Sequence, residues 1–126
     1  MRVFIATMIA FVLFLGLAWW NTSYLNKTSE QLADRGENIR KLVFDEKWED
    51  ADIEVLQIRR LWGHHKKTWL LFFDHQDIDS IDNALYRINE MIRCREKAQA
   101  LSDIAEFRFY VQDISDKENL SLANIF

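Results

Sequence analysis

The clearest candidates for chemistry are one histidine and two aspartates in the segment DHQDIDSID. His75, Asp79 and Asp82 are spaced i, i+4 and i+7, which on a helix places an imidazole and two carboxylates on one side, within reach of a divalent metal ion. The same residues suit an exposed first helical turn, where negative charge opposes the helix dipole favourably. We expect this structural role and no metal site. If the protein did bind a metal ion, His75, Asp79 and Asp82 would be the candidate ligands.

Two further groups of residues could bind a ligand. His64 and His65 are adjacent and point in different directions, so His65 fits a packed, hydrogen-bonded histidine better than a metal ligand. A second series recurs every seven residues: Trp48, Val55, Trp62 and Trp69. These side chains could line a pocket for an aromatic or quaternary amine ligand, but tryptophans at helical spacing are ordinarily core residues, which is what we expect here.

The remaining composition argues against catalysis and against nucleic-acid binding. The sequence has no recognisable nucleophile motif and no phosphate-cradling glycine loop. Its single cysteine, Cys94, excludes an internal disulfide and a CxxC site. Arg2 is one of the 16 Lys and Arg residues, and all 20 Asp and Glu follow it, so the rest of the chain is acidic and unsuited to gripping nucleic acid. We expect no catalytic residue, no cofactor and no enzymatic activity.

The element that must position everything else is the uncharged run VFIATMIAFVLFLGLAWW, residues 3–20. Roughly 20 apolar residues are what a helix needs to cross a bilayer, and Trp19 and Trp20 favour the headgroup boundary. Residues 1–20 are therefore expected to form a transmembrane signal anchor.

Three topologies remain open for this segment: an uncleaved anchor with the domain outside, a cleaved signal peptide, and an anchor with a cytoplasmic domain. The positive-inside rule barely separates them, because Arg2 on one side faces Lys27 and Arg35 on the other. A short basic leader before an apolar run is typical of a secretory signal, and Gly16 and Ala18 are small residues at the spacing that a signal peptidase reads. The bulky Trp19 and Trp20 just after them disfavour cleavage. We expect a single-pass protein of the cell membrane with an extracytoplasmic C-terminal domain.

The remaining chain, about 105 residues, is long enough for one core. It has no proline and few glycines, which favours an all-α fold. Apolar stripes predict helices over 21–43, 45–73, from about 75 to 93, and from about 97 to 118, with Asp45 and Asp74 as N-caps. The economical arrangement is an antiparallel up-down four-helix bundle over 21–118; three helices, with the last two continuous, is the alternative. Residues 119–126 are expected to be an extended tail.

The first two helices of this bundle look complementary in size. The small residues of the first are Thr28, Ser29 and Gly36. Counting outward from the intervening turn places Trp62 opposite Ser29 and Val55 opposite Gly36.

An unbroken helix over 45–73 would also be about 10 Å longer than the helix over 22–43, and would carry its apolar end to the bilayer. The expected membrane-interface residues are Trp19, Trp20, Trp69, Leu70, Leu71 and Phe126. A break at Gly63, which would let Leu70 and Leu71 pack inside, is the alternative.

The order of anchor, tryptophan-rich helix, the junction DHQDIDSI and the closing NLSLANIF resembles a family of short membrane-anchored bacterial proteins of Gram-positive spore formers, classed only as a domain of unknown function. His75 with the acids after it and the terminal Asn124-Ile125-Phe126 carry most of the resemblance. The resemblance implies an anchored, all-helical fold and transfers no catalytic role.

These observations leave two functional hypotheses. The first is a non-enzymatic surface module that binds another membrane or surface protein. The second is an extracytoplasmic bundle that senses a small ligand or metal ion through a partner protein, because this sequence has no second apolar span to carry a signal. The oligomeric state is left open.

Overall fold

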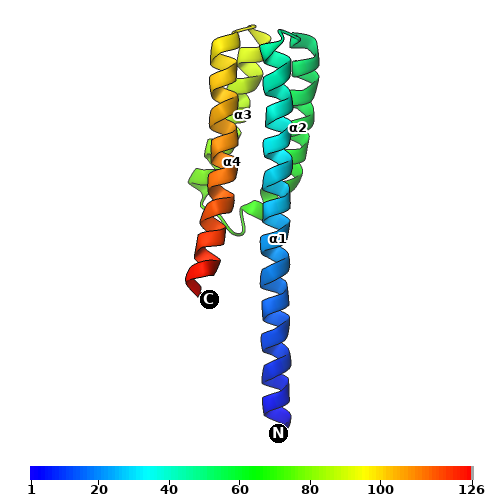
Figure 1. Ribbon diagram of the computed structural model, residues 1–126, viewed down its shortest axis with the longest axis vertical. Helices are drawn as coiled ribbons and strands as arrows, with labels where there is room; N and C mark the ends of the chain where they lie inside the picture. The colour runs from blue at the N-terminus through cyan, green and yellow to red at the C-terminus, as the bar shows by residue number, and fades with distance from the viewer. Residues whose placement is uncertain (126) are drawn as a thin grey trace.

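The computed structural model describes the backbone of residues 1–125 and the side chains of residues 1–117. This part of the chain forms four helices: α1 (Arg2–Phe44), α2 (Trp48–Trp69), α3 (His75–Arg93) and α4 (Lys97–Ile125). Each helix packs against the next, and α4 closes the ring against α1 (Figure 1). The expected all-α bundle is confirmed, with four helices and not three.

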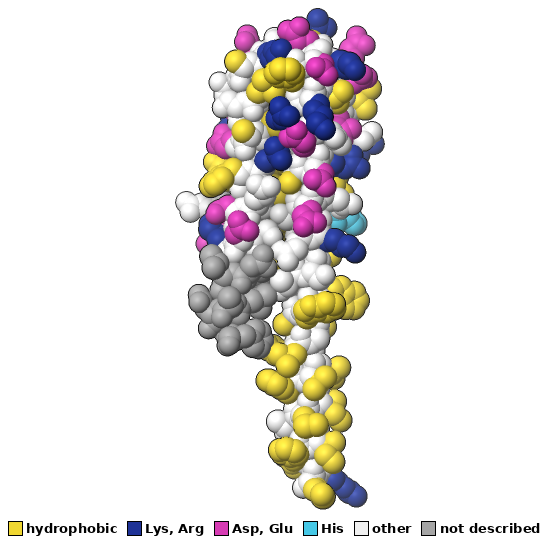
Figure 2. Space-filling view, viewed as in Figure 1, with side chains coloured by type: hydrophobic (Ala, Val, Ile, Leu, Met, Phe, Trp, Pro, Cys, Tyr) yellow, Lys and Arg dark blue, Asp and Glu magenta, His cyan; other side chains and the backbone are white. Residues whose placement is uncertain are grey.

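Helix α1 is a single helix of 43 residues that passes from the apolar segment into the bundle without interruption. Its first part projects beyond the other helices (Figure 1) and presents apolar side chains on its surface, whereas charged side chains cover the bundle (Figure 2). Burial begins at Leu25 and recurs at Leu32, Ile39 and Val43, so this stripe holds α1 in the core. Among the described residues, α1 is the one helix whose length and composition suit a membrane anchor or a signal sequence.

The turn between α1 and α2 corrects one predicted cap. Asp45 is the C-cap of α1, and Lys47, not Asp45, is the N-cap of α2. The reason is a Schellman motif: Glu46 adopts a left-handed φ of 58°, its N–H donates to the Val43 carbonyl, and the Lys47 N–H donates to the Leu42 carbonyl. Because Asp45 and Glu46 form the C-terminal cap of α1, α2 begins only at Trp48.

The turn between α3 and α4 contains a second Schellman motif. Arg95 has a φ of 56°, its N–H donates to the Ile92 carbonyl, and the Glu96 N–H donates to the Met91 carbonyl. The predicted break near residues 93–97 is therefore confirmed. Both Schellman turns lie at the end of the bundle farthest from the N-terminus (Figure 1).

The small face of α1 packs against α4, so the predicted pairing with α2 is wrong. The Ser29 hydroxyl donates to the Val111 carbonyl of α4 at 3.0 Å. A Cβ on Gly36 would meet Arg108 and Phe107 of α4. In a closed ring each helix has two neighbours, and the periodicity that marks the buried side of α1 does not say which neighbour receives its small residues.

Helix α2 is shorter than expected and is not broken at Gly63. It ends at Trp69, after which the Leu71 and Phe72 N–H groups donate three residues back, to the Thr68 and Trp69 carbonyls, and tighten the chain into a turn. Its 22 residues rise about 33 Å, which matches the part of α1 beside it, so the predicted excess length does not exist. Asp74 lies at the N-cap of α3 as predicted, without a side-chain capping bond.

The predicted extended tail at 119–126 is wrong for the described residues, because α4 continues to Ile125. The segment lacks charges after Glu118 but contains no proline or glycine, and leucine and alanine favour a helix. Absence of charge makes a segment less soluble and does not end a helix. Phe126 lies outside the described residues.

Candidate functional site

The structure does not bring His75, Asp79 and Asp82 together around a metal site. Asp82 is engaged by α2: one carboxylate oxygen accepts from the Trp62 indole N–H at 2.7 Å and the other contacts the Lys66 ammonium at 2.6 Å. His75 and Asp79 are exposed. In the part of the chain that the structure describes, no group of three or more His, Cys, Asp or Glu residues is arranged to hold a metal ion. Asp82 instead ties α3 to α2.

Trp62 and Trp69 of α2 are core residues, as expected, and Trp48 is partly buried against the core. Trp62 and Trp69 are both buried and meet edge to face, with ring centroids 5.3 Å apart. Trp69 is only 1% exposed and also contacts Phe73, so it cannot meet lipid as the predicted membrane-interface set required. Although Trp69 is the last residue of α2, its ring faces the core, because the buried stripe of α2 continues to the end of the helix.

His65 contributes a polar contact between α1 and α2. Its Nδ1 lies 2.5 Å from the Tyr24 hydroxyl, and the two rings meet edge to face. Burial lowers the pKa of His65, and the neighbouring charge of His64 acts in the same direction. The Nδ1 of a neutral imidazole accepts a hydrogen bond from the Tyr24 hydroxyl, as expected for a packed, hydrogen-bonded histidine.

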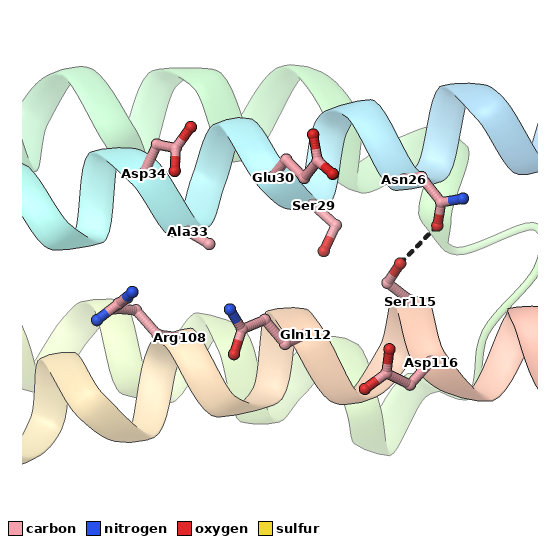
Figure 3. Close-up of a pocket in the computed structure, with 9 residues that line it drawn as sticks. All are labelled: Asn26, Ser29, Glu30, Ala33, Asp34, Arg108, Gln112, Ser115 and Asp116. Atoms are coloured by element: carbon pink, nitrogen blue, oxygen red, sulfur yellow. Dashed lines mark hydrogen bonds between the residues drawn. The ribbon is translucent and has the colours of Figure 1, made fainter.

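A polar cavity of about 360 Å³ lies between α1 and α4 (Figure 3). Ser29 and Ala33 of α1 point towards α4 (Figure 3), and the Ser115 hydroxyl of α4 donates to the Asn26 side-chain oxygen at 2.7 Å. The complete lining is Asn26, Ser29, Glu30, Ala33, Asp34, Arg108, Gln112, Ser115 and Asp116. The cavity exists because small residues of α1 leave space beside α4. The sequence feature that indicates this cavity is the small face of α1, but we expected that face to pack against α2 and not against α4.

An apolar groove of about 750 Å³ lies where α1 leaves the bundle. One wall is α1 and the other is the turn after α2. Its lining residues are Phe14, Leu17, Ala18, Trp20, Asn21, Tyr24, Thr68, Leu71 and Phe72. It is the larger of the two cavities, and unlike the polar cavity it joins the bundle to the apolar segment of α1.

The predicted membrane-interface residues fall in different places around this groove. Trp19 and Trp20 are exposed, and Leu71 is 78% exposed on the turn. Leu70 is partly buried against the core. Phe126 lies outside the described residues. The sequence therefore located one residue of each wall, Trp20 on α1 and Leu71 on the turn, but not the rest of the lining.

The fold and the apolar groove together define the class of protein. It is a closed up-down-up-down four-helix bundle whose first helix extends into an apolar N-terminal segment, with an apolar groove where this segment meets the bundle. The chain belongs to the family described as Domain of unknown function (DUF4363), whose model matches residues 19–125. The match begins at Trp19, so it covers the bundle and leaves out most of the apolar segment. No curated protein and no solved structure matches the chain.

Proposed function

We propose that this protein is a single-pass, membrane-anchored helical module whose bundle lies outside the cytoplasm and binds another membrane or surface protein without catalysing a reaction. The observation that carries the proposal is the unbroken helix α1, which joins the apolar segment to the bundle and sets the bundle's orientation on its anchor. A partner in or near the same membrane would meet a rigid surface at a fixed height.

The pattern of charged contacts supports a structural role for the polar side chains. Arg35 of α1 pairs with Glu54 of α2 at 3.1 Å, and Arg108 of α4 pairs with Glu37 of α1 at 2.8 Å. Arg87 of α3 reaches both Asp103 and Glu106 of α4. These groups connect neighbouring helices, which favours a module that holds one shape over a site whose charges act on a substrate.

A second candidate function is sensing of a small polar ligand or metal ion through a partner protein. The polar cavity between α1 and α4 favours the small polar ligand over the metal ion. Glu30, Asp34, Asp116 and Arg108 line one space, but no three acidic groups of the described residues are arranged to hold a metal. Thermal unfolding of the full chain with divalent metals and small amines tests it, since a ligand that binds the folded state raises the melting temperature.

Topology is tested through Cys94, the only cysteine, which is exposed near the end of the bundle farthest from the anchor. A membrane-impermeant maleimide added to intact cells should label Cys94, and a Cys94→Ser variant is the control for background. Labelling only after lysis would contradict the extracytoplasmic position.

Partner binding is tested by a photo-crosslinking amino acid in the full chain in its native membrane. Suitable positions are Gln31 on α1 and Leu56 on α2, which are both exposed. A discrete protein adduct at one of these positions and its absence at the other would support a defined docking face. Equal, diffuse adducts at both positions, or none, would contradict the proposal.

A further inference from the structure

We propose that the apolar groove at the base of the bundle binds one anionic phospholipid, with an acyl chain between α1 and the turn after α2 and the phosphate beside Lys27 and Lys67. This inference rests on the proposed membrane anchoring of α1. It assigns a ligand class to a groove that protein-partner binding does not explain.

The groove lies at the right height for a lipid. Along α1 its lining runs from Phe14 to Tyr24, a rise of about 15 Å. Trp19 and Trp20 are exposed within this span, and tryptophans favour the boundary between hydrocarbon and headgroups. Phe14 therefore lies at acyl-chain depth and Tyr24 lies at or above the headgroups.

The second wall is apolar and turned outward. Leu71 is 78% exposed and Phe72 is 46% exposed, although both follow a helix whose last tryptophan is fully packed. Exposing such side chains to water costs about 25 cal/mol for each Å² of apolar surface, and contact with an acyl chain removes that cost. The α2 end thus offers a lipid-facing surface opposite the α1 wall.

Two lysines neighbour the residues that line these walls. Lys27 is three residues beyond Tyr24, on the same side of α1, and Lys67 immediately precedes Thr68. Both lysines are exposed, and within residues 1–117 neither forms an ion pair, whereas Lys66 is held by Asp82. Figure 2 shows a histidine and a Lys or Arg side chain just above the apolar side chains at the join.

The charge distribution at the base selects an anionic headgroup. Most acidic residues of this end belong to the other two helices: Asp77 and Asp79 to α3, Asp113 and Asp116 to α4. Glu30 of α1 and Asp74 in the turn after α2 are the exceptions. The α1–α2 side, which contains the groove, is therefore less acidic than the α3–α4 side in a chain whose net charge is −4. A second copy docked groove to groove would bring the same lysines together, so like charges oppose that occupant. A phosphate between them removes the repulsion.

The test is native mass spectrometry of the full chain, purified in detergent with equal amounts of phosphatidylglycerol and phosphatidylcholine. We expect one phosphatidylglycerol retained per chain in preference to phosphatidylcholine, with each lysine contributing about fivefold. The Lys27→Gln/Lys67→Gln variant should retain the two lipids equally. The Leu71→Gln/Phe72→Gln variant should retain little of either.

Matched controls make the result specific to the groove. Lys41→Gln/Lys47→Gln removes the same charge at the far end of the bundle, and Ile53→Gln/Leu56→Gln removes exposed apolar side chains elsewhere on α2. Both controls should behave as the parent, and circular dichroism should show that all four variants are folded. Equal retention of the two lipids by the parent, unchanged retention in the groove variant, or a lipid-free dimer would overturn the proposal.

The anchoring on which the inference depends is tested separately, by alkaline carbonate extraction of membranes that contain the parent chain. Release into the soluble fraction would remove both the anchor and the lipid site. A chain that stays in the membrane but retains no phosphatidylglycerol would remove the lipid site alone.

Discussion

The Cβ position of Gly36 on α1 lies 2.9 Å from Cγ of Arg108 on α4, closer than real Cβ atoms approach other heavy atoms. The Phe107 ring is 3.5 Å away on the same side. Arg108 is also fixed from its far end, where its guanidinium contacts Glu37 at 2.8 Å. The absence of a side chain at Gly36 therefore sets how closely α1 and α4 pack.

Replacing Gly36 by leucine should destabilise the bundle. Overpacking costs about 1 to 3 kcal/mol, and the better helix propensity of leucine offsets at most about 1 kcal/mol. Thermal or denaturant unfolding of the full chain in detergent micelles measures the difference. A Gly36→Leu variant as stable as the parent would contradict the close packing of α1 on α4.

Gly63→Ala provides the matched control. Gly63 lies inside α2, and a Cβ there would meet nothing within 4 Å. The substitution should therefore stabilise the chain by about 0.5 to 1 kcal/mol through helix propensity alone. If both glycine substitutions changed stability in the same direction, local packing would not be the cause.

Asp82 is predicted to stabilise the contact between α2 and α3. Asp82→Ala leaves the nearly buried Trp62 indole N–H without its acceptor, which should cost about 1 to 3 kcal/mol. Asp82→Asn keeps one acceptor oxygen and should cost less. A double-mutant cycle with Trp62→Phe measures the coupling directly, and zero coupling energy would mean that the bond contributes nothing.

The two Schellman turns offer a stabilising substitution. Glu46 and Arg95 have left-handed backbones, which cost a residue with a Cβ about 1 to 2 kcal/mol and cost glycine little. Glu46→Gly and Arg95→Gly should each raise stability by up to about 1 kcal/mol, as measured by unfolding of the full chain. Asp45→Gly is the control in the same loop: its φ is −83°, so glycine there should destabilise.

Much of the fold could be predicted from hydrophobic periodicity. The stripe Ile78, Ile81, Leu85, Ile88 and Ile92 of α3 is buried throughout, as are Ile104, Phe107, Val111 and Ile114 of α4. Periodicity identifies the direction in which a helix is buried. It does not identify the neighbour, which is why Ser29 and Gly36 were paired with α2. Turn geometry was also missed, because Glu46 and Arg95 are not residues that ordinarily mark a left-handed cap.

The candidate sites were less predictable than the fold. Trp20 and Leu71 could be assigned to an interface from composition, because a tryptophan pair and an apolar run are visible in the sequence. Tyr24 could not, since its place in the groove follows from how α1 lies against the end of α2. The polar cavity joins Ser29 to Ser115, and only the closure of α4 against α1 brings residues so distant in sequence together.

The contact between Tyr24 and His65 should make stability depend on pH. Burial lowers the pKa of His65 in the folded chain, so the unfolded chain, with a histidine pKa of about 6.5, binds the proton more readily. Stability should be fully present above about pH 6.5 and should fall as the pH drops towards the folded-state pKa. Glu37, whose pKa is lowered chiefly by its hydrogen bond from Arg40, loses its contribution only at lower pH, below its ordinary pKa of 4.5.

Melting temperatures of the full chain between about pH 7.5 and pH 5 measure this dependence. His65→Gln removes the titrating group, so the decline across this range should become shallower. The melting temperature at the upper end should fall, because glutamine is a poorer replacement as acceptor of the Tyr24 hydrogen bond. Tyr24→Phe should lower the melting temperature most above pH 6.5, where the neutral His65 would otherwise accept its hydrogen bond. His75→Gln changes an exposed histidine at the start of α3 and should leave the decline unaltered. Parallel curves for His65→Gln and the parent would show that His65 does not cause the decline.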